Sequence, residues 1–315
     1  MPRRRSLEER LAELNELRAD PTSDAAIEKL REALSSKLNH LVAEAARIVG
    51  EFEVEQLQPD LAHAFDRFME NPARADPLCL AKTAIAEALW RMGSHREELF
   101  LQGIHHVQLE ASYGGKEDAA AKLRVACALG LVRTSYPRVM VELAHLLADQ
   151  ETDARIGAAR AVASLPSGAA EPLLRFKALV GDEDTQVMYE CFGALLTVAA
   201  DASLPFVGGF LQHEDPALGK AAALALGESR LSGAFDLLKT DWQEGFDPDL
   251  RRTELLAIAM LRHERAMDFL LSLIADAPPT HARDAIAALE MYRRDQELWE
   301  RVERLIEARE DVDLS

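Results

Sequence analysis

The chain has 315 residues, of which 48% are hydrophobic and 6% aromatic, and its formal net charge is -18. A chain of this length can bury a large core, and a core built from repeats needs no second domain. The acidic balance disfavours a protein that binds duplex DNA, because such proteins normally carry a basic surface.

The first predicted element is a short helix over residues 6–18. Ser6 and Glu9 form the capping box that begins it, and leucines at helical spacing give it one apolar stripe. A second helix is expected over 24–34. We expect residues 1–36 to cap the first repeat. The alternative is a short dimerising coiled coil, but the apolar run is too short to specify one.

Longer repeats are expected up to about residue 118. Residues 111–118, which include Tyr113, Gly114 and Gly115, form the longest interruption of the pattern. A surface loop is the ordinary interpretation, and a loop that contacts a partner is the alternative, because long loops in compact repeats are often functional. The helices of this part are predicted over 37–52, 59–69, 78–92 and 96–109.

From residue 119 onward the chain repeats one plan, an alanine-rich helix, a turn, a leucine-rich helix and an acidic turn. Residues 149–187 show it most clearly, where Arg155 is followed eight positions later by Ala163. Equivalent frames recur roughly every 31–33 residues after Gly130 and about every 40 residues before it. This is the period of stacked helix pairs.

Stacking explains why the two helices of a pair differ in composition. The first helix is packed between its partner and the next repeat, so it carries small residues on two faces, and Gly130 and Gly227 are expected at close approaches. The second helix carries larger side chains. We therefore expect an all-α solenoid of stacked antiparallel helix pairs over 37–309, without a sheet, and a frayed acidic tail at 310–315.

The alanine runs resemble the first helix of HEAT repeats. They read ACALG at 126–130 and AALALG at 222–227, and an Asp precedes the pattern at Asp153 and Asp249. The resemblance covers roughly 37–309 and implies an armadillo-type superhelix. Met188 and Gly219 stand where the family has Arg, so an Asp–Arg ladder between repeats would be interrupted there.

Enzymes with HEAT-like folds are the alternative that this resemblance brings. Deoxyhypusine hydroxylases place His-Glu pairs at equivalent points of their repeats to bind two irons, but His213 and His263, each followed by Glu, are not equivalent here. Glycosylases that remove alkylated bases from DNA would need a basic groove, with Trp242 or Trp299 beside a carboxylate. The third resemblance is to phycobilin lyase subunits. No catalytic, cofactor-binding or metal-binding residue is predicted.

The three cysteines indicate a reducing environment. Cys79, Cys127 and Cys191 are far apart, form no CxxC motif and fall within or beside predicted first helices. We expect buried reduced thiols and a cytoplasmic location. No run of about 18 apolar residues suggests a membrane span.

The leading hypothesis is a non-enzymatic scaffold for protein–protein interaction. The second helices are expected to line the concave surface, and large side chains there are the candidate partner contacts: Phe100, Phe176, Phe206, Trp242 and Phe269. The turns between pairs are acidic, and the turns within pairs are basic. The acidic edge either keeps the protein soluble or steers a basic partner, with Asp182, Asp184 and Asp249 as the residues to test.

Overall fold

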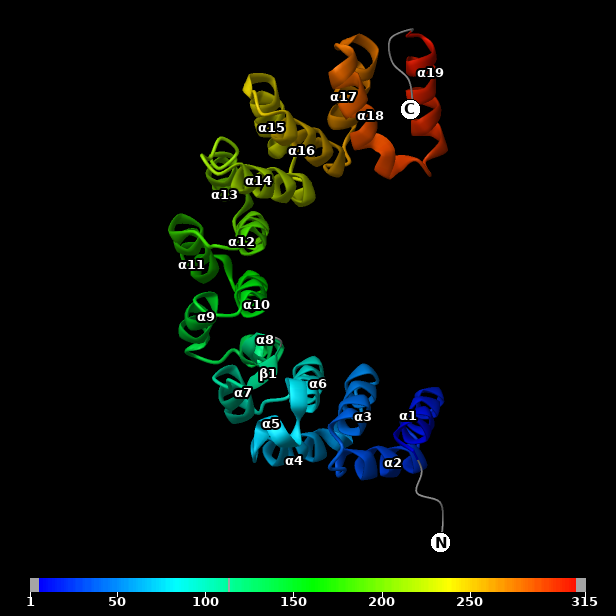
Figure 1. Cartoon of the computed structure of the whole chain (residues 1–315), viewed down its shortest axis with the longest axis vertical. Coiled ribbons are helices and arrows are strands. Elements are labelled where there is room, and N and C mark those ends of the chain that lie inside the picture. The colour runs from blue at the N-terminus through cyan, green and yellow to red at the C-terminus, as the bar shows by residue number, and fades with distance from the viewer. Residues whose placement is uncertain (1–5, 113, 310–315) are drawn as a thin grey trace. The chain divides into compact units, whose positions relative to one another are not determined.

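The computed structural model describes residues 6–112 and 114–309 (Figure 1). The predicted frayed tail at 310–315 and Tyr113 lie outside these residues. The chain divides into two compact units, Met1–Ser164 and Leu165–Ser315. Each unit is a stack of antiparallel helix pairs, which confirms the predicted solenoid architecture.

The first unit contains two rows of helices, and the capping box of Ser6 and Glu9 begins its first helix as predicted. The first helices of the pairs are α1 (Leu7–Glu16), α3 (Asn39–Glu51), α6 (Leu80–Arg91), α8 (Ala121–Arg133) and α10 (Thr152–Ala163). The second helices are α2 (Asp24–Leu34), α4 (Gln58–Met69), α7 (Glu97–Ile104) and α9 (Val139–Leu147). Short turns of helix connect them: η1 (Leu17–Ala19), η2 (Glu55–Leu57), α5 (Pro72–Ala75) and η3 (Pro77–Cys79).

The second unit continues the same plan with shorter connections. Its first helices are α12 (Thr185–Val198), α14 (Pro216–Ser229), α16 (Pro248–Met260) and α18 (Pro279–Leu289). Its second helices are α11 (Ser167–Val180), α13 (Ala200–Gly208), α15 (Ser232–Glu244), α17 (Glu264–Asp276) and α19 (Gln296–Glu307), and η4 (Glu290–Tyr292) follows α18.

Small residues set how closely the first helices approach their neighbours. A Cβ atom added at Gly130 would lie 2.5 Å from the ring of Phe100 on α7, and one added at Gly227 would lie 2.5 Å from the carbonyl oxygen of Ala257 on α16. Both glycines therefore sit at close approaches to a neighbouring repeat, as predicted. The buried alanines of the first helices serve the same packing, because larger side chains would separate the rows.

A β-hairpin interrupts the helices between α7 and α8, where the sequence suggests a loop. Strand β1 (Leu109–Ser112) pairs with the antiparallel strand β2 (Gly115–Asp118), with Leu109 opposite Asp118. The helix expected over 96–109 ends at Ile104. Gly114 takes a φ of +109°, which favours glycine and allows the tight turn between the strands. The fold is thus all-α apart from this hairpin.

A buried polar network fastens the hairpin to α6. Lys82 and Asp76 are both fully buried, and the Nζ atom of Lys82 lies 3.3 Å from Oδ2 of Asp76 and 2.9 Å from Oε1 of Gln108. Gln108, the residue before β1, also donates from Nε2 to the carbonyl oxygen of Asp76 at 2.9 Å. Each buried charge has a partner, so the desolvation cost is offset and the base of the hairpin is held in place.

Arg124 on α8 continues this network toward α10. Its guanidinium donates to Oδ2 of Asp118 at 2.6 Å and to Oδ1 of Asp149 at 2.8 Å. Burial alone would raise the pKa of Asp118, but backbone N–H groups and the Arg124 guanidinium outweigh it and hold that pKa below its usual value. Eight positions before Gly130, the spacing that separates Arg155 from Ala163, stands Lys122, which is exposed. The buried cation of α8 is instead Arg124.

Candidate functional site

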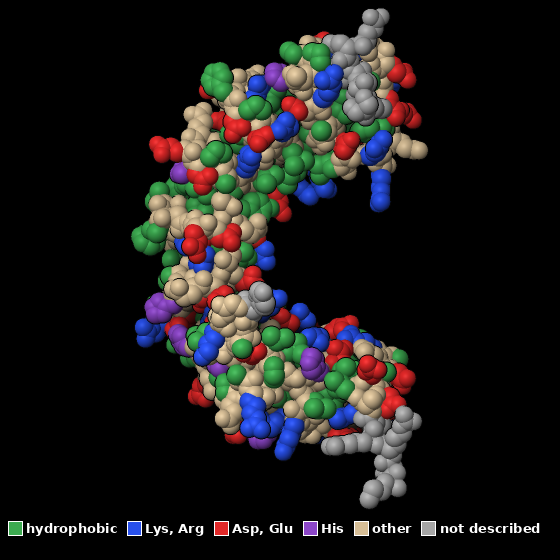
Figure 2. Space-filling view, in the orientation of Figure 1, with side chains coloured by type: hydrophobic (Ala, Val, Ile, Leu, Met, Phe, Trp, Pro, Cys, Tyr) green, Lys and Arg blue, Asp and Glu red, His purple; other side chains and the backbone are tan. Residues whose placement is uncertain are grey.

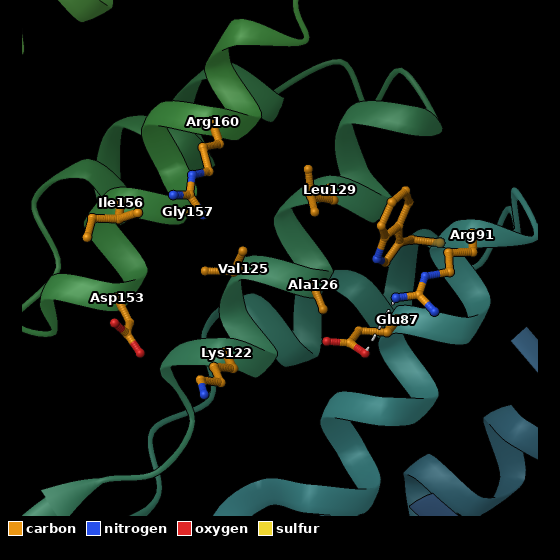
Figure 3. A pocket seen from close by; sticks show the side chains of 11 residues that line it. Glu87, Arg91, Lys122, Val125, Ala126, Leu129, Asp153, Ile156, Gly157 and Arg160 are labelled. Atoms are coloured by element: carbon orange, nitrogen blue, oxygen red, sulfur yellow. Dashed lines mark ion pairs between the residues drawn. The ribbon is translucent and has the colours of Figure 1, made fainter. Parts of the chain in front are cut away.

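A groove crosses the first helices α6, α8 and α10 of the first unit (Figure 3). Its cavity volume is about 380 Å³. The apolar lining consists of Trp90 from α6, Val125 and Leu129 from α8, and Ile156 from α10. Large apolar pockets with a few polar groups at the border are the usual form of binding sites.

Helical spacing brings the lining residues of each helix onto one face. Lys122, Val125 and Leu129 follow one another at intervals of three and four residues along α8, and the residues from α6 and α10 are spaced similarly. Gly157 lets α10 approach α8 closely, because a Cβ atom there would lie 2.3 Å from Cγ2 of Val125. The groove is therefore a consequence of the same small-residue packing that builds the stack.

Charged side chains surround the apolar floor. The lining includes Glu87 and Arg91, whose charged groups are 4.0 Å apart, and Lys122, Asp153 and Arg160. Figure 2 shows Lys and Arg side chains over α6 and α8 of this unit. Three cations and two anions thus line a groove in a chain whose formal net charge is -18. Cations accordingly outnumber anions locally, against the balance of the whole chain.

One further arginine lies near the turn that follows α6. Arg133 lies one helical turn beyond Leu129 on α8. Its Nε atom would be 3.1 Å from a Cβ atom added at Gly93, which follows α6 and has a φ of +66°. Arg91 lines the groove beside Trp90, and Arg133 lies by Gly93, three residues further along the chain than Trp90. The Trp90 end of the groove is therefore the part of the site best suited to a carboxylate.

Trp90 was not among the candidate contact residues predicted from the sequence. Trp90 stands eight positions after Lys82, at the place where the regular repeats have Ala163, Gly227 or Ala259. A tryptophan in place of a small residue was the signal that could have located the groove. Trp90 is only half-buried, whereas Trp242 and Trp299 are 6% and 8% exposed.

The aromatic residues proposed as partner contacts do not form one site. Phe100 is fully buried against Gly130, and Trp242 is buried against the guanidinium of Arg251, so neither offers a surface to a partner. Phe269 packs edge-on against Trp242 with ring centroids 5.5 Å apart. Of the five, Phe206 and Phe269 are half-buried and Phe176 is exposed.

The second helices were expected to line the concave binding surface, and hollows occur on both rows: one of about 310 Å³ is lined by residues of the second helices α2 and α4, and two lie on first helices. The first of these two is the groove over α6, α8 and α10. The other, of about 530 Å³, lies in the second unit and is lined by residues of α12, α14 and α16, including Tyr189, Lys220 and Met260. The reason for the two hollows on first helices is packing, because the small residues that allow close approach also leave space between successive first helices.

The acids of the predicted acidic edge have roles within the fold. The carboxylate of Asp182 lies 2.6 Å from Nζ of Lys177 and is only 3% exposed. Asp184 accepts the N–H of Gln186 at 2.9 Å and caps α12. Asp249 is 59% exposed and pairs with Arg252. Asp182 and Asp184 are therefore structural residues as well as surface charges, and only Asp249 resembles a solvated rim charge.

The histidines considered as metal ligands also stabilise local structure. Nδ1 of His213 accepts the N–H of Asp215 at 3.0 Å, and Nδ1 of His263 accepts the N–H of Ala266 at 3.2 Å at the start of α17. Within residues 6–112 and 114–309, no group of three or more His, Cys, Asp or Glu side chains is arranged to hold a metal ion. The three cysteines are buried and unpaired by disulfides.

Comparison with known proteins identifies the repeats. A family model for HEAT repeats matches residues 172–259. Residues 172–259 contain HEAT repeats. The resemblance drawn from the alanine runs is confirmed, and helix pairs also occur outside the matched residues. No curated protein sequence matches the chain.

Several solved structures are similar to this chain at low sequence identity. Human deoxyhypusine hydroxylase in complex with glycerol is 19% identical, with 83% of this chain and 92% of that chain covered and a TM-score of 0.33. The YibA protein of Escherichia coli is 13% identical, with 93% of this chain and 99% of that chain covered and a TM-score of 0.49. The complex of CpcE and CpcF of phycocyanin lyase from Nostoc sp. PCC7120 is 17% identical, with 88% of this chain and 94% of that chain covered and a TM-score of 0.35. Likeness at this level carries no argument about function.

Proposed function

We propose that this HEAT-repeat protein is a non-enzymatic scaffold that binds a segment of a partner protein in the groove over α6, α8 and α10. The observation that carries the proposal is the apolar floor of Trp90, Val125, Leu129 and Ile156 inside a border of charged side chains. A half-buried tryptophan surrounded by aliphatic side chains and arginines has the composition of binding hot spots in protein interfaces.

The occupant that fits best is a segment with an apolar anchor next to acidic residues. The anchor would lie on Val125 and Leu129, and a neighbouring carboxylate would meet Arg91 or Arg133 at the Trp90 end. The negative charge of the rest of the chain opposes this weakly, because screening limits such forces to a Debye length of about 8 Å at physiological salt. Local charge complementarity therefore decides what binds in the groove.

The environment proposed for this protein is the cytoplasm. Burial raises the pKa of the Cys79 and Cys191 thiols to about 12, which keeps both as unreactive thiols. Buried thiols without disulfides are typical of reducing compartments. In the part of the chain that the structure describes, every helix is too short or too polar to cross a membrane.

Site-specific photo-crosslinking tests the groove as the binding site. The photoreactive residue p-benzoylphenylalanine is placed at Val125 in the groove, or at the exposed Val141 on α9 as the matched control in the same unit. In extract of the native host, we expect a discrete adduct from position 125 that position 141 does not give. The adduct should disappear when Ile156→Glu is added, while circular dichroism shows unchanged helicity. Equal adducts from both positions, or an adduct that survives Ile156→Glu, would refute the proposal.

A further inference from the structure

The outward face of α11 in the second unit carries an exposed apolar stripe. Phe176 is 65% exposed, Leu179 71% and Val180 66%. Ala169 and Pro172, also exposed, extend the stripe toward the start of the helix. The intervals from Ala169 to Leu179 are three, four and three residues, which is the spacing of a seam that packs against another helix. Figure 2 shows hydrophobic side chains projecting at the level of α11.

The neighbouring helix α13 extends this face. Arg175 of α11 donates from Nη2 to the carbonyl oxygen of Ala202 at 2.6 Å, and its guanidinium lies 4.5 Å from the ring centroid of Phe206. These contacts fix α13 beside α11. Pro205 is exposed on α13, and Phe206 is half-buried next to it. Two adjacent helices thus present apolar side chains to the same solvent region.

The positive charges of this face are already engaged within the protein. Nε of Arg175 lies 2.8 Å from Oε1 of Glu171, and Nζ of Lys177 lies 2.6 Å from Oδ2 of Asp182. The sequence of α13 contains no Lys or Arg. Asp201 on α13 is an exposed acid at the border, and Glu183 after α11 is an exposed acid that also interacts within the protein. The surroundings of the apolar stripe are accordingly acidic.

We infer that the face formed by α11 and α13 binds a basic amphipathic helix of a partner protein. Apolar residues of that helix, spaced by three and four, would pack on Phe176, Leu179 and Val180, and flanking Lys or Arg side chains would face Asp201. From Ala169 to Val180 the stripe is about 16 Å long at about 1.5 Å per residue, so it accommodates three turns of helix.

The size of the face argues for a short helix rather than a second copy of the chain. A standard protein–protein interface uses about 20–30 residues on each side. The stripe offers five residues of α11, and α13 adds Ala202, Pro205 and Phe206. Two copies meeting through this face would also bring their exposed acids together, and like charges opposed across an interface are unfavourable.

Fluorescence anisotropy with two designed peptides tests the inference. The probe is a fluorescein-labelled helical peptide of about 14 residues, with leucines spaced by three and four and lysines beside them. The matched probe has glutamates in place of the lysines. The full-length protein should bind the lysine peptide at least about tenfold more tightly than the glutamate peptide at low salt, and the difference should shrink as salt is added.

Four variants assign the binding to this face. Phe176→Ser and Leu179→Ser should each weaken binding of the lysine peptide by about tenfold or more. Phe246→Ser, which removes a side chain that is 96% exposed outside the stripe, and Trp90→Ala in the groove should leave it unchanged. Because Phe176 and Leu179 are exposed, circular dichroism of their variants should match that of the original protein.

Three results would overturn the inference. Equal affinity for the two peptides would show that the acidic border does not contribute to recognition. Binding that is lost in Trp90→Ala but retained in Phe176→Ser would place the peptide in the groove instead. Concentration-dependent dimerisation in sedimentation velocity that Phe176→Ser abolishes would show that the occupant is a second copy of the chain.

Discussion

The buried carboxyl group of Glu254 makes the stability of the second unit depend on pH. Glu254 lies on α16, is fully buried, and is next to the nearly buried Asp241 of α15. Burial, together with the neighbouring carboxyl group of Asp241, raises the pKa of Glu254 to about 9 from an ordinary value of 4.5. Arg251 opposes this shift but does not cancel it.

The sign of the effect follows from where the proton is held. Between the two pKa values, the folded protein keeps a proton on Glu254 that the unfolded chain releases. The free energy of unfolding therefore falls as pH rises, by about 1.4 kcal/mol for each pH unit. Below pH 4.5 the contribution of Glu254 is fully present, and it is lost as pH rises toward about 9. From about pH 6 to about pH 8 the loss is on the order of 3 kcal/mol.

Replacing Glu254 by glutamine isolates this contribution. Glu254→Gln keeps the shape of the side chain but removes the titration, so we expect the difference in stability between variant and original protein to grow by about 3 kcal/mol from pH 6 to pH 8. Urea unfolding followed by circular dichroism measures it, and other titrating groups cancel in the difference. Glu244→Gln, at an exposed position of α15, is the matched control and should show no such change. Parallel pH profiles for Glu254→Gln and the original protein would refute the reasoning.

Three other changes test the packing and charge assignments. Lys82→Ala leaves the buried carboxylate of Asp76 with hydrogen-bond donors but without its cation, so it should lower the free energy of unfolding by about 3–5 kcal/mol in urea titrations, and an effect below about 1 kcal/mol would contradict the assigned network. Ala223→Leu or Ala225→Leu should overpack α14 and cost about 1–3 kcal/mol, whereas an unchanged urea midpoint for both would mean that these alanines do not face neighbouring helices. Asp182→Lys should lower the melting temperature because it breaks the pair with Lys177, while Asp249→Lys, at a solvated position, should leave it nearly unchanged; equal melting temperatures would show that Asp182 has no structural role.

The sequence predicted the repeat architecture well because small residues at helical spacing leave few alternatives. Gly130 and Gly227 were placed correctly at close approaches, and the helix predicted over 24–34 coincides with α2. Such features depend on neighbours along the chain or on the repeat period, both of which are visible in a single sequence.

The hairpin was missed because its stability comes from residues distant in the chain. Asp76 and Lys82 contact Gln108 across 32 and 26 positions of sequence, and no local pattern reports such contacts. Arg124, the buried cation of α8, likewise contacts Asp118 of the hairpin, and the repeat period led to Lys122 instead.

The groove was missed because the sequence does not show which faces of a helix remain uncovered. Phe100 and Phe176 have the same side chain on second helices, yet one is fully buried and the other is 65% exposed. The difference depends on tertiary packing rather than on residue type. Trp90 was visible only as an unusually large residue at a position that is small in the regular repeats.

Acrylamide quenching of tryptophan fluorescence tests the central claim, that the groove over α6, α8 and α10 binds a partner segment. Trp242 and Trp299 are buried at 6% and 8% exposure, so the quencher reaches mainly Trp90 in the groove. When the segment recovered by crosslinking from Val125 is added to saturation, we expect quenching to fall and the emission to shift to shorter wavelength, because the indole of Trp90 becomes covered. Quenching that stays the same at saturation would show that the segment binds elsewhere and would contradict the assignment of the groove as the binding site.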